Sequence, residues 1–169
     1  MPKVLVNYVR QIELMNTRIG KIFKFGLFVM LGFMTIAVVG RLVLKTPAQW
    51  TLEMGMFVLG AYYFIAGGYV LLRDEHVRMD AFYSRWNPRK RAIADAATFF
   101  LLAIYIIVLI RGGISDTVFS WTYGQHSSTT WGPMLAPAKG ILTTGAIILL
   151  LQAVATFIRN LATIRGKEI

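Results

Sequence analysis

The chain has 169 residues, of which 56% are hydrophobic and 15% charged, and its mean hydropathy is +0.59. This apolar share exceeds the roughly 45–50% of ordinary soluble domains and indicates a membrane protein, and the absence of cysteine excludes disulfide frameworks, thiolate catalysis and iron–sulfur or Cys-based zinc sites. The formal net charge of +10 is typical of basic residues that flank membrane spans, so we expect membrane lipids and no nucleic acid as partners.

The first expected element is an amphipathic helix over about residues 3–19. Apolar side chains recur there at helical spacing, while basic and amide side chains occupy the other faces. The apolar positions are Val4, Leu5, Tyr8, Val9, Ile12, Met15 and Ile19. A helix of this kind lies along a membrane interface, which predicts an interfacial helix ahead of the spans. The alternative is a frayed tail, because helix propensity alone rarely orders such a segment.

Four segments reach the length of about 20 mainly apolar residues that a transmembrane helix needs. They cover about residues 22–44, 50–72, 92–111 and 134–158, and an extension of the third to residue 123 stays open. Pro47 ends the first, because proline disfavours helix at the preceding residue, and Gly112-Gly113 marks a kink or an end of the third. The predicted fold is a single all-α membrane domain with four transmembrane helices.

Lys and Arg residues orient the predicted spans. They gather before the first span, between the second and third, and after the fourth. One alternate loop holds only Arg41 and Lys45, and the other holds none between Gln125 and Met134. Because basic residues in short loops resist translocation, we expect both termini in the cytoplasm.

Glu53 is the most prominent acid of the second span. Carboxylates within membrane segments are costly and usually functional. However, Glu53 lies one turn after the interfacial Trp50, so we expect capping, hydration or pairing with Arg41 or Lys45. The alternative is a proton-coupling role, as in a small exporter.

The segment from Arg73 to Asp80 alternates in sign and contains His76. A metal site is disfavoured there, because a single histidine stands among arginines and no thiolate is present. Catalysis is also disfavoured, because a general base needs a pocket that shifts its pKa, whereas this segment lies at a headgroup boundary where water is available. We expect a cytoplasmic elbow, with Arg73 at the carboxyl end of the second helix, and neither an enzyme nor a cofactor site.

Small residues recur every four positions at the start of the fourth span, at Gly132, Ala136 and Gly140, and Gly60 lies in the second span. Such stripes let helix backbones approach in lipid. They serve either the packing of this chain or a partner interface. In the loop before them, a His/Ser pair has no acid nearby in sequence, which argues against hydrolysis.

Several of these residues occur in an order that resembles a known family. They are Trp50-Thr-Leu-Glu53, Gly60, His76-Val77, Asp80, the segment SSTTWGP, and the pair Pro137 and Gly140. In this order on a four-span chain, they resemble the small, DctQ-like membrane subunit of tripartite ATP-independent periplasmic (TRAP) transporters. The resemblance covers essentially all four spans and makes these residues candidates for structural or subunit contacts, with no substrate-binding residue among them.

The resemblance implies a non-catalytic scaffold in a bacterial inner membrane. Its partners would be a large elevator-type membrane subunit and a periplasmic substrate-binding protein that delivers an organic acid, of the dicarboxylate or sialic acid class, for sodium-driven uptake. A redox membrane anchor is the other alternative. Against it, His76 and His126 fall on opposite sides of the membrane, so they cannot ligate one haem together.

Overall fold

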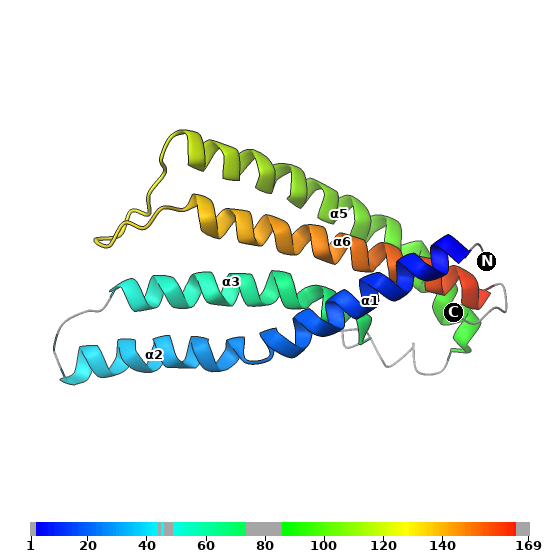
Figure 1. Ribbon diagram of the computed structural model, residues 1–169, viewed down its shortest axis with the longest axis horizontal. Helices are drawn as coiled ribbons and strands as arrows, with labels where there is room; N and C mark the ends of the chain where they lie inside the picture. Colours follow the sequence, from blue (N-terminus) through cyan, green and yellow to red (C-terminus); the bar gives the residue numbers. More distant parts are fainter. Residues whose placement is uncertain (1–2, 44, 46–48, 74–85, 165–169) are drawn as a thin grey trace.

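The computed structural model describes residues 3–43, 45, 49–73 and 86–164, and these form five helices (Figure 1). The helices are α1 (Lys3–Phe23), α2 (Gly26–Val43), α3 (Gln49–Leu72), α5 (Pro88–Thr122) and α6 (Ala136–Ile164). Four helical stretches are long and apolar enough to cross a membrane: α1 with α2, then α3, α5 and α6. The predicted all-α fold with four helices of spanning length is therefore confirmed.

Two helices are longer than the apolar segments from which they were expected. α5 begins with Pro88, which is tolerated in a first turn, and continues through Gly112-Gly113 without ending. Its close contact with α6 at Gly113 stabilises the helix there. α6 continues to Ile164, and the burial of Ala162, which is 1% exposed, stabilises its last turns.

The four spanning helices form a single row (Figure 1). α2 packs against α3, α3 against α6, and α6 against α5, and among the described residues any other contact between these four is marginal. A row leaves two broad faces uncovered. Large apolar side chains are accordingly exposed along it, including Leu42 at 74% and Leu101 at 73%. In a membrane these faces are available to lipid and to partner proteins.

The row has two distinct ends along the direction of the helix axes. The beginning of α1, the end of α6 and the end of α3 lie at one end in Figure 1, which we call the terminal end. The loop Tyr123–Leu135 lies at the other, which we call the loop end. This arrangement agrees with an even number of crossings. The assignment of the terminal end to the cytoplasm stays a prediction.

α1 crosses the row at the terminal end and packs against α3 and α6. Its buried residues are Val9, Asn16 and Gly20. At Gly20 an added Cβ would lie 2.3 Å from the Tyr69 ring, so only glycine permits this approach. The amphipathic pattern therefore serves contact with the protein, and a position along the membrane surface stays a prediction.

α6 forms the centre of the row, and its buried face consists mainly of small residues. They are Ala136, Gly145, Ala146, Ala153, Ala155 and Ala162. Gly145 makes the closest approach to α3: an added Cβ would lie 2.7 Å from Cβ and 2.8 Å from the backbone carbon of Phe64. On the α5 side, the Phe99 and Phe157 rings stack at 4.3 Å between centroids.

The expected stripe of small residues is wrong in one member. Gly132 lies in the loop ahead of α6, with φ +56°, because the helix begins only at Ala136. At Gly140 an added Cβ would be in ordinary contact with Thr117, at 3.6 Å. On α5 and α6 the tight glycine positions are instead Gly113, at 2.5 Å from Thr143 Oγ1, and Gly145.

Gly145→Ala is expected to lower the stability of the chain by about 1–3 kcal/mol, because the new methyl group meets the α3 backbone, which cannot yield as a flexible side chain does. Thermal unfolding in detergent, followed by circular dichroism, measures this loss. Gly32→Ala is the matched control, since no atom lies within 4 Å of a Cβ at that position. Equal melting temperatures for the two variants would contradict the α3–α6 packing described here.

Candidate functional site

Polar side chains gather at both ends of the row. The loop-end cluster consists of Glu53, Asp116, Ser120, Gln125, Ser127 and Lys139. The terminal-end cluster consists of Tyr8, Glu13, Asn16, Gln152, Thr156 and Arg159. Each cluster joins different helices, through bonds that sequence spacing alone did not reveal.

The loop Tyr123–Leu135 has a hairpin-like backbone. Ser127 N donates to Pro133 O at 2.9 Å, and His126 and Met134 form an isolated antiparallel bridge. His126 Nδ1 donates to Gly132 O at 2.7 Å, because a carbonyl oxygen can only accept. The imidazole is thus engaged in holding the loop.

Glu53 receives its hydrogen bond from this loop. Ser127 Oγ donates to Glu53 Oε1 across 74 sequence positions. The expected ion pair with Arg41 or Lys45 is wrong, because among the described residues no salt bridge joins them to Glu53. No acid is near Ser127 in sequence, but α3 supplies one in the folded chain. Glu53 Oε2 is buried and has no hydrogen-bond partner in the described part of the chain.

Lys139 ties the start of α6 to α5. Its Nζ lies 3.0 Å from Asp116 Oδ2 and donates to Gln125 Oε1, also at 3.0 Å. Ser120 Oγ donates to the same Gln125 oxygen at 2.7 Å. A lysine near a helix amino terminus is electrostatically unfavourable, and the Asp116 carboxylate offsets this. These two contacts hold Lys139 within the protein.

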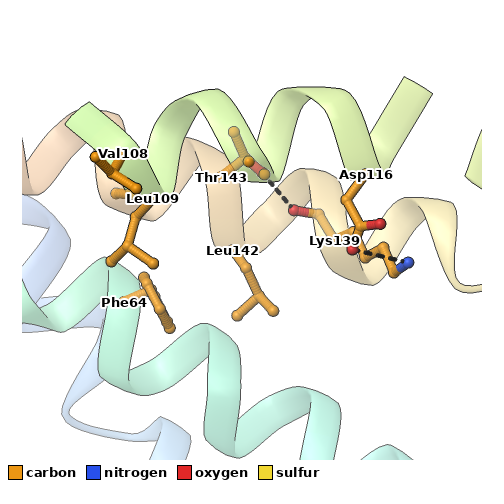
Figure 2. A pocket seen from close by; sticks show the side chains of 10 residues that line it. Phe64, Val108, Leu109, Asp116, Lys139, Leu142 and Thr143 are labelled. Atoms are coloured by element: carbon orange, nitrogen blue, oxygen red, sulfur yellow. Dashed lines mark hydrogen bonds and ion pairs between the residues drawn. The ribbon is translucent and has the colours of Figure 1, made fainter. Parts of the chain in front are cut away.

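A groove of about 270 Å³ opens between α3, α5 and α6 (Figure 2). Figure 2 shows Phe64, Val108 and Leu109 together at one end, and Asp116 with Lys139 at the other. The lining is therefore apolar apart from the ion pair and Thr143, whose hydroxyl donates to a backbone oxygen of its own helix.

The terminal-end cluster fixes α1 to α6. Asn16 Nδ2 donates to Gln152 Oε1 at 2.8 Å, and both side chains are completely buried. Asn16 Oδ1 lies against Gly68, where an added Cβ would approach it to 2.4 Å, and it has no hydrogen-bond partner among the described residues. Hydrogen bonds of this kind hold helices together in lipid.

Two weaker bonds flank this one. Tyr8 OH donates to Leu151 O at 3.2 Å, and the partly buried Arg159 pairs with Glu13 at 3.3 Å. Sequence reasoning missed this cluster, although one signal was available. Asn16 and Gln152 are uncharged polar residues at positions where the apolar pattern calls for hydrophobic ones.

The structure does not bring the predicted site residues together. Trp50 lies at the loop end, 43% exposed and in edge contact with Phe33 at 6.3 Å. Arg73 lies at the terminal end, where its Nε donates to Tyr69 OH at 2.9 Å. Across the described ranges no three His, Asp or Glu side chains converge as metal ligands.

The other predicted residues lie in three places. Gly60 faces α6, where an added Cβ would lie 3.1 Å from Leu142 Cδ2. Ala136 and Pro137 open α6, in the first turn where proline is tolerated. His76 and Asp80 lie outside the described residues.

Comparison with known families gives one finding. A family model described as tripartite ATP-independent periplasmic transporters, DctQ component, matches residues 30–163. The match includes α3, α5 and α6 and most of α2. Comparisons with curated proteins and with solved structures give no match.

Ser127→Ala is expected to destabilise the loop end by about 1–3 kcal/mol, because it leaves both oxygens of the Glu53 carboxylate without a hydrogen-bond partner. Hydrogen exchange of the loop amides and the melting temperature report the change. Ser128→Ala, at an exposed neighbouring position, serves as the control. If Ser127→Ala behaves like the control, the Glu53 bond does not hold the loop.

Asn16→Leu and Gln152→Leu are each expected to loosen α1, because each leaves a buried amide without its partner. The double variant should recover most of the lost stability, since no unpaired amide then remains. Melting temperatures of the two single variants and the double variant form the cycle. Additive losses would contradict a direct bond between these side chains.

Proposed function

The chain belongs to the DctQ family of tripartite ATP-independent periplasmic transporters, and we propose that this small permease subunit acts as the fixed scaffold for a larger membrane subunit. The family match over residues 30–163 is the observation that carries this proposal. The partners would be a large elevator-type subunit, which transports the substrate, and a periplasmic binding protein, which delivers it.

The open row of helices supports a scaffold role. A row exposes broad apolar faces, and one of them can lie against a large partner while the other contacts lipid. The row is also tied at both ends, by the α1–α6 bonds and by the Glu53–Ser127 bond. These ties favour a subunit that keeps its shape while its partner moves.

The helices provide little support for transport by this chain alone. Self-sufficient secondary transporters commonly use discontinuous half-helices near the bilayer midplane. Within the described residues α3, α5 and α6 are each continuous. Glu53 lies about 6 Å from the start of α3 and is bonded to a loop serine, which does not favour a midplane proton site.

We infer the remaining features from the family. The membrane would be the bacterial inner membrane, uptake would be coupled to sodium, and the substrate would be an organic acid of the dicarboxylate or sialic acid class. The terminal end, where basic residues such as Lys3, Arg10 and Arg159 lie, would face the cytoplasm.

The proposal predicts a stable complex between this chain and a large membrane subunit from the same genome. The chain contains no cysteine, so single cysteines can be introduced and cross-linked without a background reaction. Suitable exposed apolar positions lie on each spanning helix: Val38, Tyr63, Leu101 and Ile141.

After co-expression, we expect the two chains to co-purify. In a cysteine scan that starts from these positions, we expect the cross-links to fall on one contiguous face of the row. A cysteine at the exposed loop residue Ser128 provides a position outside the membrane-facing helices. Elution of this chain alone, with no cross-link from any position, would contradict the scaffold role.

A further inference from the structure

The groove between α3, α5 and α6 has an unusual distribution of polarity for a surface inside a membrane. Its apolar end is formed by Phe64, Val108 and Leu109, and its other end carries an ion pair (Figure 2). Asp116 and Lys139 neutralise one another, and together they offer a polar ligand one group of each charge at the side of the row.

The ion pair is unequally exposed. The Asp116 side chain is 61% exposed and the Lys139 side chain 23%. The Lys139 ammonium also bonds Gln125, so part of its capacity is used within the protein. The groove thus presents an accessible carboxylate beside a partly accessible ammonium, with no net charge.

The position of the pair along α5 matches a lipid headgroup. α5 has 35 residues and is about 52 Å long, whereas the hydrocarbon core is about 30 Å thick, so a centred helix would extend about 11 Å beyond the core at each end. Asp116 lies about 9 Å before the helix end at Thr122, and in that arrangement it would lie at headgroup level. Val108 lies about 12 Å deeper, within one leaflet.

We propose that this groove binds one phospholipid with an ethanolamine headgroup. The primary ammonium contacts Asp116, the phosphate contacts Lys139, and part of one acyl chain lies in the apolar end. The proposal requires only that the chain spans a membrane, and it is independent of the proposed transport function.

The apolar end of the groove suits an acyl chain, because aromatic and aliphatic side chains line it. Charge favours a zwitterionic lipid over an anionic one, because the exposed Asp116 carboxylate repels a headgroup that carries only negative charge.

Gly112 offers a way to fill the groove without disturbing the helices. It lines the groove, and a Cβ built there meets no atom within 4 Å. Gly32 on α2 is equally open and lies outside the groove, so Gly32→Leu is the matched control. Asp116→Asn removes the ammonium contact and keeps the Lys139–Gln125 bond available.

The experiment titrates the purified full chain in mild detergent with dioleoyl phosphatidylethanolamine, phosphatidylcholine or phosphatidylglycerol. Native mass spectrometry counts the bound lipids, and the melting temperature reports stabilisation. We expect one tightly retained phosphatidylethanolamine in the parent chain and in Gly32→Leu, and its loss in Gly112→Leu. Asp116→Asn should still bind lipid but lose the preference for ethanolamine.

Three results would overturn the proposal. The first is equal retention of the three lipids by the parent chain, and the second is undiminished phosphatidylethanolamine retention in Gly112→Leu. The third is a Gly112→Leu variant that keeps its lipid but no longer co-purifies with a large membrane subunit. That result would assign the groove to a partner protein. If the parent chain keeps its lipid selectivity but does not co-purify with a large membrane subunit, only the proposed scaffold role is contradicted.

Discussion

The contact on which the arrangement depends is the close approach of α6 to α3 at Gly145, where the absence of a side chain lets α6 approach the backbone of Phe64 and Ile65. In lipid, apolar helices gain little from leaving a solvent that is itself apolar, so association relies on close packing and on polar bonds. α6 packs against α5, α3 and α1, and its small buried alanines let the backbones of these three helices approach it closely. Because α2 packs mainly against α3 among the described residues, the row is held together from α6 outwards.

Hydrogen bonds and an ion pair join the helices in addition to close packing. At the terminal end, Asn16 and Gln152 join α1 to α6 in a completely buried position. At the loop end, Glu53 on α3 holds Ser127, and Lys139 on α6 holds Asp116 on α5. Each pair joins two elements, and two of the three pairs are separated by more than 70 positions in sequence. A row fixed in this way at both ends suits a subunit that we propose to remain still while its partner moves.

The sequence predicts the helices well and their mutual contacts poorly, for a physical reason. Apolar length identifies the four spans, and the mixed faces of residues 3–19 identify the first helix as amphipathic. Periodicity does not say whether an apolar face meets lipid or protein, because both are apolar. The packing of α1 across α3 and α6 was therefore not foreseen.

The same limit explains the errors at individual residues. For Glu53 we expected capping, hydration or pairing with Arg41 or Lys45, but its partner Ser127 is adjacent only in the folded chain. Gly132 fitted a spacing of four, yet it precedes the helix and adopts a positive φ. By contrast, the family resemblance rested on residues in a fixed order, and the match over residues 30–163 confirms it.

The most direct test of the scaffold role is reconstituted uptake. Proteoliposomes would contain this chain, a large subunit from the same genome, or both, with the cognate binding protein and a labelled organic acid outside and an inward sodium gradient. The account predicts uptake only when both membrane chains are present, and none from this chain alone. Undiminished uptake by the large subunit without this chain, or uptake by this chain alone, would contradict it.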